Sequence, residues 1–430
     1  MQMLSTLDPD FDARFARIVA DRRESTDDVA ASVSSILSAV KSRGDEALVE
    51  YTARFDHHDI VTDSDWTIAP EACEAAYKAL DAELREALDL AAARIRAYHA
   101  AQLPEDRDYT DDAGVRLGAI WRAVDAAGLY VPGGRAAYPS SLLMNAIPAK
   151  VAGVERLAIC TPTPRGKTND LVLAAAHVAS VDEIWRVGGA QAVGAFAYGT
   201  GRIGAVDVIT GPGNAYVAEA KRQLYGVVGI DMVAGPSEIL VIADKDNDPD
   251  WIAADLLSQA EHDPTSQSIL ITDDAGFAAL VDDCVTVQTS QLSTEAVARE
   301  SWETNGVIIV VEDLAREAPP LADRLAAEHV ELAIAEPESM LREIRHAGSV
   351  FLGRMTPEAI GDYVGGPNHV LPTGRRARFS SGLSVLDFMK RTSFLEVNEA
   401  AFARIGPAAA TLAHAEGLPA HARSVELRRK

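Results

Sequence analysis

The sequence predicts an α/β fold built from two doubly wound units. Short β-branched runs alternate with helical stretches, and the alternation occurs in two successive rounds along the chain. Such alternation is typical of βαβ units, in which helices cover both faces of a parallel sheet. The first round has strand runs at 128–134, 156–163, 183–189 and 206–213, with helices expected near 141–152, 169–180, 190–199 and 214–226.

A second parallel sheet is expected from the round that begins at residue 238. Its strand runs are bounded by turn residues and are rich in Ile, Leu and Val, as buried parallel strands are. The strand runs are 238–244, 266–274, 306–313 and 348–354, and the helices are expected near 249–262, 275–284, 313–328 and 336–346.

The segments outside the two rounds are predicted to be an arm, two helical stretches and a tail. Residues 1–24 are short and charged, which indicates an N-terminal arm. A helix is expected to begin near Ser25 or Thr26, since either side chain can cap it, and to end at Gly44. An Ala-rich helical stretch covers about 70–100. Residues 383–430 contain no strand run and are interpreted as a helical tail.

Composition narrows the class of protein. A chain of 430 residues that is 48% hydrophobic is globular and long enough for two or three domains. The net charge of −24 disfavours nucleic-acid binding. The acidic surface suggests a salt-rich cytoplasm, with an ordinary acidic cytosolic enzyme as the alternative. Three dispersed cysteines, no signal peptide and no long apolar run predict a cytoplasmic protein with no membrane partner.

Glycine-rich turns follow several strand runs of the first round. They are Gly133–Gly134, Gly188–Gly189 and Gly211–Gly213. Ligands bind at the carboxyl ends of strands in doubly wound sheets, so three such turns favour a ligand over ordinary turn chemistry. The GxGxxG match at 199–204 follows a helix and opens a strand, which is the wrong order for a dinucleotide fingerprint.

Two polar clusters could carry chemistry in the second round. Gln259 and His262 are three residues apart on one helix face, so they could chelate a metal ion or form an ordinary polar helix end. Glu328 and His329 are adjacent at a helix-to-strand junction. They could act as two general bases, with an exposed acidic turn as the alternative.

Further polar residues stand later in the chain. Asp362 and His369 lie in a glycine-rich loop, and Glu416 and His421 flank a turn in the helical tail. These side chains could be metal or substrate ligands, or simply solvated surface.

Taken together, these motifs resemble histidinol dehydrogenase. The similar segments include AGPSEILV (234–241) and SQAEHD (258–263), and the similarity runs from about residue 25 to the end in the same order. The other segments that carry it are 128–154, 188–200, 211–226, 327–333, 366–393 and 415–421.

The resemblance implies an activity and a set of site residues. The family oxidises L-histidinol through L-histidinaldehyde to L-histidine, the last steps of histidine biosynthesis, with two NAD⁺ and one Zn²⁺ per site. The implied bases are Glu328 and His329. The implied metal ligands are Gln259, His262, Asp362 and, from the partner subunit, His421. Substrate contacts match these four ligands, His329, Ser237, His369 and Glu416 of the partner subunit, and NAD⁺ contacts match Tyr130, Gln191 and Asn214.

The resemblance also implies how the chain is divided. An arm (1–24) precedes a zinc-binding catalytic domain made of 25–129 and 238–381, whose early helices are expected to pack on the later sheet. An incomplete Rossmann-like unit (130–237) would bind NAD⁺. The tail (382–430) would cross to the partner in an intertwined homodimer.

Three other functions could use some of the same residues or the same fold. A dehydrogenase of the same fold could use zinc and NAD⁺ on a different small polar or sulfonated alcohol. A zinc hydrolase could use the same His, Asp and Glu residues, although the chain has no HExxH motif. A catalytically inactive binding homologue would normally have lost some ligands or the Glu-His pair, and none is missing here.

Overall fold

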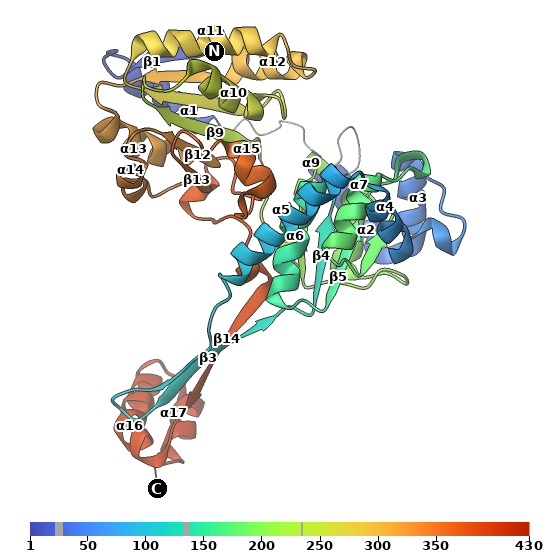
Figure 1. Ribbon diagram of the computed structural model, residues 1–430. Helices are drawn as coiled ribbons and strands as arrows, with labels where there is room; N and C mark the ends of the chain where they lie inside the picture. Colours follow the sequence, from blue (N-terminus) through green and yellow to red (C-terminus); the bar gives the residue numbers. More distant parts are fainter. Residues whose placement is uncertain (22–28, 133–137, 234, 430) are drawn as a thin grey trace.

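The computed structural model contains two α/β units, each with a parallel sheet, that lie beside each other. A narrow antiparallel β-ribbon carries the last helices away from both units (Figure 1). The structure describes residues 1–21, 29–132, 138–233 and 235–429. The predicted α/β fold with two parallel sheets is therefore confirmed. The expected capping residues Ser25 and Thr26 and the turn Gly133–Gly134 lie outside the described residues.

The first unit is a five-stranded parallel sheet in the order β6-β5-β4-β7-β8. This is a doubly wound order in which the chain starts in the middle and winds to each side in turn. The final strand has only two residues, so the unit is a short version of the fold. The strands are β4 (Ala126–Tyr130), β5 (Arg156–Cys160), β6 (Glu183–Trp185), β7 (Val208–Thr210) and β8 (Gly229–Ile230).

Helices bury both faces of this sheet in two apolar cores. One face is covered by α2 (Ala30–Arg43), α3 (Asp45–Asp56), α8 (Gly189–Tyr198) and α9 (Ala215–Leu224). The other is covered by α4 (Pro70–Ala79), α5 (Ala82–Ala100), α6 (Pro139–Ala152) and α7 (Asp170–Val178).

The second unit is a six-stranded parallel sheet in the order β1-β11-β10-β9-β12-β13. Its central strand β9 is buried at all six positions, which explains its continuous apolar run. The strands are β1 (Gln2–Ser5), β9 (Glu238–Ala243), β10 (Gln267–Thr272), β11 (Val307–Val310), β12 (His329–Ala333) and β13 (Ser349–Leu352).

Helices also cover both faces of the six-stranded sheet. On one face lie α1 (Phe11–Ala20), α13 (Leu314–Leu325) and α14 (Pro337–Glu343). On the other lie α10 (Pro249–Ala260), α11 (Ala275–Thr289) and α12 (Glu295–Asn305). Short helical turns join the larger elements at η1 (Asp63–Asp65), η2 (Pro164–Gly166), α15 (Glu358–Ile360), η3 (Gly361–Gly365), η4 (Arg376–Arg378) and η5 (Val385–Phe388).

The predicted arm is wrong for the part of 1–24 that the structure describes. Residues Gln2–Ser5 form β1, which pairs in parallel with β11 at the edge of the six-stranded sheet. The next helix, α1, buries Phe11, Phe15 and Ile18 against the same sheet. The charged residues face outward, and the few apolar ones were too short a run to predict a strand and a helix.

The expected packing of the early helices is also wrong. Helices α2, α3, α4 and α5 contribute their apolar faces to the five-stranded sheet and not to the later one. The amphipathic pattern of α2, with Val33, Ile36, Leu37 and Val40, predicts that one face of the helix is buried. The pattern does not predict which sheet the helix packs against.

The C-terminal tail contains a strand that was not predicted. β14 (Met389–Glu396) pairs antiparallel with β3 (Arg116–Ala123), and β2 (Arg107–Thr110) pairs with the other side of β3. This ribbon ends in a lobe of two helices, α16 (Glu399–Ala415) and α17 (Pro419–Glu426), which lies apart from both sheets (Figure 1). β14 is largely exposed, so it lacks the alternating apolar pattern that predicts a half-buried strand. Among the described helices, none is both long and apolar enough to cross a membrane.

A buried ion pair ties the second sheet to the loop that follows β13. Arg375 Nη1 lies 3.0 Å from Glu238 Oε1, and both side chains are only 1% exposed. Arg375 also donates to Gln267 Oε1 at 2.7 Å, so one guanidinium joins the first residues of β9 and β10. Removing one partner of a buried pair leaves the other charge without compensation, which is costly.

Replacing Arg375 by Met is therefore expected to lower the free energy of unfolding by about 3 kcal/mol or more. Urea denaturation of the two proteins measures the difference. The control is Arg299→Met, which breaks an exposed i,i+4 pair with Glu295 and should cost less than about 0.5 kcal/mol. Equal losses in the two variants would contradict the assigned importance of the buried pair.

Candidate active site

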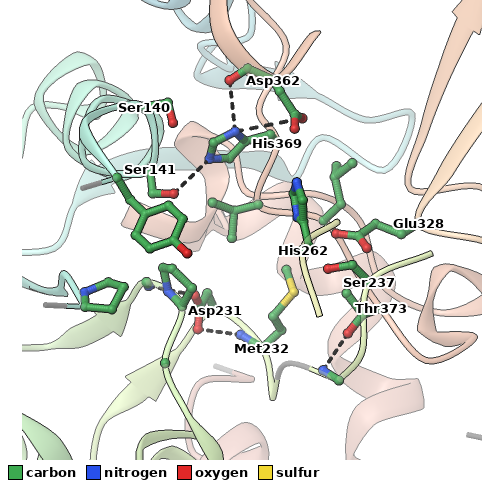
Figure 2. Close-up of a pocket in the computed structure, with 18 of the residues that line it drawn as sticks. Ser140, Ser141, Asp231, Met232, Ser237, His262, Glu328, Asp362, His369 and Thr373 are labelled. Carbon is green, nitrogen blue, oxygen red and sulfur yellow. Dashed lines mark hydrogen bonds and ion pairs between the residues drawn. The ribbon is translucent and has the colours of Figure 1, made fainter. Parts of the chain in front are cut away.

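A cavity with a volume of about 450 Å³ lies between the two α/β units. It faces the carboxyl-end turns of the five-stranded sheet, but the amino ends of β9 and β12 in the six-stranded sheet. In Figure 2, His262, Glu328, Asp362 and His369 surround one space from different elements. The sequence-predicted residues that line it are Ser237, Gln259, His262, Glu328, His329, Asp362 and His369.

Glu328 and His329 are both held by the first residue of β9. The main-chain N–H of Glu238 donates to Glu328 Oε2 at 3.0 Å. The carbonyl oxygen of the same residue lies 3.2 Å from His329 Nδ1. The two candidate bases are buried at the junction between α13 and β12, so the alternative of an exposed turn is wrong.

The hydrogen bond to Glu238 decides which nitrogen of His329 carries the proton. A carbonyl oxygen can only accept, so Nδ1 is the donor and Nε2 has the free lone pair. Nε2 has no hydrogen-bond partner among the described residues and lies 3.8 Å from Asp362 Oδ1. Burial lowers the pKa of His329 to about 3, well below the ordinary near-neutral value, because the imidazolium loses its hydration. The ring is therefore a neutral proton acceptor at neutral pH.

Asp362 lies on η3, a single π-helical turn that places it beside two imidazole rings. Its main-chain oxygen is 3.0 Å from His369 Nδ1, while His369 Nε2 is 3.3 Å from Ser141 Oγ on α6. Burial raises the pKa of Asp362 to about 6. Single π-turns occur often at functional sites because the extra residue redirects a side chain.

Gln259 and His262 enter the cavity from the end of α10. The Gln259 side chain is 1% exposed, and neither atom of its amide group has a hydrogen-bond partner among the described residues. An unpartnered buried amide costs free energy, and a ligand in the cavity would satisfy it. His262 is exposed at the rim of the same cavity.

Two residues that the sequence did not single out shape the opposite wall. Lys221 and Asp231 form a buried ion pair and both line the cavity. Lys221 Nζ donates to the carbonyl oxygen of Gly211 at 3.0 Å, and Asp231 Oδ2 accepts from the N–H of Gly211 at 2.9 Å. Gly211 has a φ of +111°, and a Cβ atom there would lie 2.2 Å from the main-chain oxygen of Tyr130. The pair thus fixes a turn that only glycine can make.

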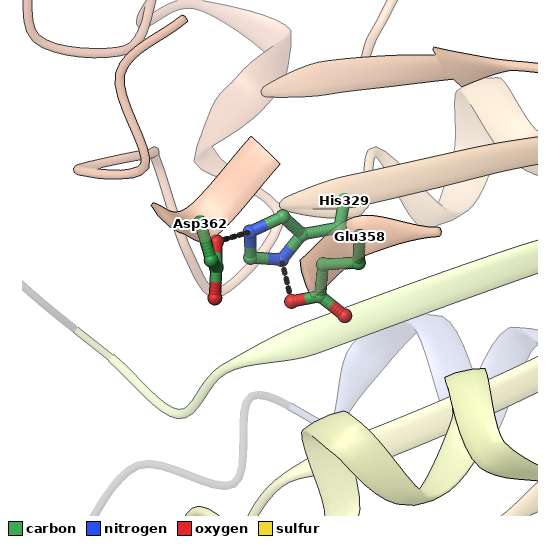
Figure 3. A group of neighbouring side chains, drawn as sticks. All are labelled: His329, Glu358 and Asp362. Atoms are coloured by element: carbon green, nitrogen blue, oxygen red, sulfur yellow. Dashed lines mark ion pairs between the residues drawn. The ribbon is translucent and has the colours of Figure 1, made fainter. Parts of the chain in front are cut away.

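Glu358, on α15, is a third residue that sequence reasoning missed. Its carboxyl group lies beside His329 and Asp362, and ligand atoms of the three residues are within 4.8 Å of one another (Figure 3). Burial raises the pKa of Glu358 well above its ordinary value. In a chain with 64 acidic residues, an isolated Glu carries no signal in the sequence.

The residues predicted to contact NAD⁺ share the carboxyl-end edge of the five-stranded sheet. Tyr130 ends β4, and its hydroxyl accepts from the N–H of Gly189 at 3.1 Å. Gln191 lies in the first turn of α8, buried, with no partner for its amide atoms in the described chain. Asn214 caps α9 through bonds to two main-chain N–H groups. None of the three lines the cavity itself, which reaches only the neighbouring residues Pro132 and Gly211–Gly213.

Glu416 and His421 lie far from the cavity. Both are exposed, in the lobe formed by α16 and α17 at the end of the ribbon (Figure 1). One copy of the chain therefore does not bring them to the other candidate ligands.

Known proteins of one family match this chain over nearly its whole length. A family model described as "Histidinol dehydrogenase" matches residues 19–429. The histidinol dehydrogenase of Zymomonas mobilis is 63% identical over 416 residues, which cover 97% of this chain and 96% of that protein. The one from Rhodospirillum rubrum is 59% identical over 97% of this chain and 96% of its own length.

A solved structure supports the same assignment. The crystal structure of histidinol dehydrogenase from Elizabethkingia anophelis superposes with a TM-score of 0.94, at 35% identity, and covers 100% of this chain and 98% of that one. The chain thus belongs to the histidinol dehydrogenase family of oxidoreductases.

Proposed function

We propose that this protein oxidises L-histidinol to L-histidine through L-histidinaldehyde, with one zinc ion per site and two NAD⁺ per turnover. The observation that carries the proposal is the cavity in which a neutral His329, an unpartnered Gln259 amide and the carboxyl groups of Glu328 and Asp362 converge. The matched relatives are named for histidinol, which disfavours a different small or sulfonated alcohol as substrate.

The donor set suits zinc. Gln259 offers a buried amide oxygen that lacks a partner in the described chain, His262 an imidazole nitrogen, and Asp362 a carboxylate oxygen. His421 of the partner subunit would complete the four ligands in a homodimer. When bound, zinc supplies a Lewis acid that orients the imidazole and amine nitrogens of the substrate.

The cofactor would bind at the carboxyl-end edge of the five-stranded sheet. Tyr130, Gln191 and Asn214 lie along that edge, and the buried amide of Gln191 has donor and acceptor groups to offer. NAD⁺ supplies the hydride acceptor for each of the two oxidations. The cavity lies next to this edge, so the substrate carbon and the cofactor would meet between the two units.

The two bases divide the proton transfers. His329 Nε2 takes the alcohol proton in the first oxidation, and the carboxyl groups around the ring stabilise the imidazolium that forms. Glu328 activates the water that adds to the aldehyde, and His329 then takes the hydroxyl proton of the hydrate. Ser237, His369 and Glu416 of the partner subunit would contact the substrate, and the buried site keeps the aldehyde from escaping.

Replacing His329 by Asn is expected to lower kcat for both oxidations by about 100-fold or more, because the variant lacks the group that accepts the hydroxyl proton in each step. Glu328→Gln should reduce aldehyde oxidation by a similar factor and alcohol oxidation by much less. NADH formation from L-histidinol and from L-histidinaldehyde, assayed separately, measures the two steps. Equal losses in both steps for Glu328→Gln would refute this division of roles.

Removal of metal by a chelator is expected to abolish NADH formation from L-histidinol, and added Zn²⁺ should restore it. Gln259→Ala should lower the bound zinc, measured by elemental analysis, by about 10-fold or more, since it removes one of four ligands. The exposed Gln291→Ala is the matched control and should retain zinc. Full activity of the metal-free wild-type protein would remove zinc from the proposal.

Mixing two inactive variants tests the shared site. Gln259→Ala and His421→Ala subunits, when exchanged, should regain about one quarter of wild-type activity, because half of the dimers are mixed and each has one intact site. Gln259→Ala mixed with Asp362→Ala should regain none, since both changes lie on the same side of the interface. No recovery in the first mixture, with exchange verified, would contradict the crossing of the tail.

A further inference from the structure

Glu358 contacts the candidate base from the side opposite the reacting nitrogen. Its Oε1 lies 3.3 Å from His329 Nδ1, while Nε2 of the same ring faces Asp362 (Figure 3). Both side chains are buried, so this contact is not weakened by solvent. No role for Glu358 follows from the family motifs in the sequence.

Glu358 is itself held in place by two elements, one at its carboxyl group and one at its main chain. Its Oε2 accepts from Ser258 Oγ at 3.3 Å, and Ser258 is the α10 residue next to Gln259. Its main-chain N–H donates to the carboxyl group of Glu331 on β12. Glu358 therefore has a defined position, fixed by the helix and the strand that carry the other site residues.

Two oxygen atoms close to Nδ1 restrict the imidazole ring. Nδ1 of His329 donates to the carbonyl oxygen of Glu238 at 3.2 Å and lies 3.3 Å from Oε1 of Glu358 in an ion-pair contact. Phe351 stacks on the ring with a centroid distance of 6.0 Å. A flipped ring would leave the Glu238 carbonyl oxygen without its donor, would take the N–H away from Glu358, and would turn the lone pair of Nε2 away from the cavity.

We propose that Glu358 is a positioning residue: through Nδ1 it holds His329 in the orientation and tautomer in which Nε2 takes the proton of the substrate. The inference rests on the proposed function, which makes His329 the base. The proton passes from the substrate hydroxyl to Nε2, and Nδ1 keeps its own proton on the side of Glu238 and Glu358. This is the logic by which a carboxyl group orients the histidine of a catalytic triad.

Three substitutions separate position from charge. Glu358→Leu removes the acceptor and should lower kcat of both oxidation steps by about 100-fold, with KM for L-histidinol and bound zinc unchanged within about twofold. Glu358→Gln keeps an acceptor oxygen at the same distance and should restore kcat to within about fivefold of wild type. Glu358→Asp keeps the charge but withdraws the carboxyl group by one methylene, and should lower kcat by about 10-fold.

The control is Glu338→Gln, which alters an exposed acid on α14 that does not line the cavity, and should leave kcat unchanged. Wild-type kcat in Glu358→Leu would overturn the proposal. If that variant does not fold, an active Glu358→Asp with an inactive Glu358→Gln would overturn it, since charge and not position would matter. Loss of zinc in these variants would instead make Glu358 a metal ligand. A wild-type protein that does not oxidise L-histidinol would refute the proposed function, which is a separate outcome.

Discussion

One residue at the start of a strand organises the candidate active site. Glu238 uses its N–H to hold Glu328, its carbonyl oxygen to hold His329, and its buried carboxylate to bind Arg375. The parallel register that pairs Ile239 with His329 makes the two main-chain contacts possible. A shift of one residue in this register would move the side chain of each base to the other face of the sheet. The chemistry of the site thus depends on strand pairing as much as on the side chains themselves.

The site uses opposite edges of two similar sheets. The five-stranded sheet presents the carboxyl ends of its strands, where glycine turns leave room for a ligand. The six-stranded sheet presents the amino ends of β9 and β12, where the first N–H of β9 binds the carboxyl group of Glu328. One edge therefore suits a cofactor and the other suits acid–base groups. The cavity is where the two edges meet.

The sequence predicted the residues of the site better than it predicted the division of the chain into domains. Twelve candidate residues were predicted from the motifs, and seven of them line one cavity. Motif residues can be read locally, because each sits in a short segment with a distinctive pattern. Glu358, Lys221 and Asp231 could not be found in this way, because no short motif contains them and their roles come from contacts that form only when the chain folds. β1 and β14 were missed because one is very short and the other is mostly exposed.

The pairing of β1 with β11 has a consequence for how the protein is made. The elements of the five-stranded sheet lie together between residues 30 and 230, so that unit can form while the ribosome is still at work. Residues 2–5 have no partner until residues 307–310 have been synthesised. Until then, the apolar face of α1, with Phe11, Phe15 and Ile18, lacks part of the sheet that buries it. β1 and α1 are therefore synthesised long before the strand that completes their packing, and their exposed apolar side chains are open to aggregation during that interval.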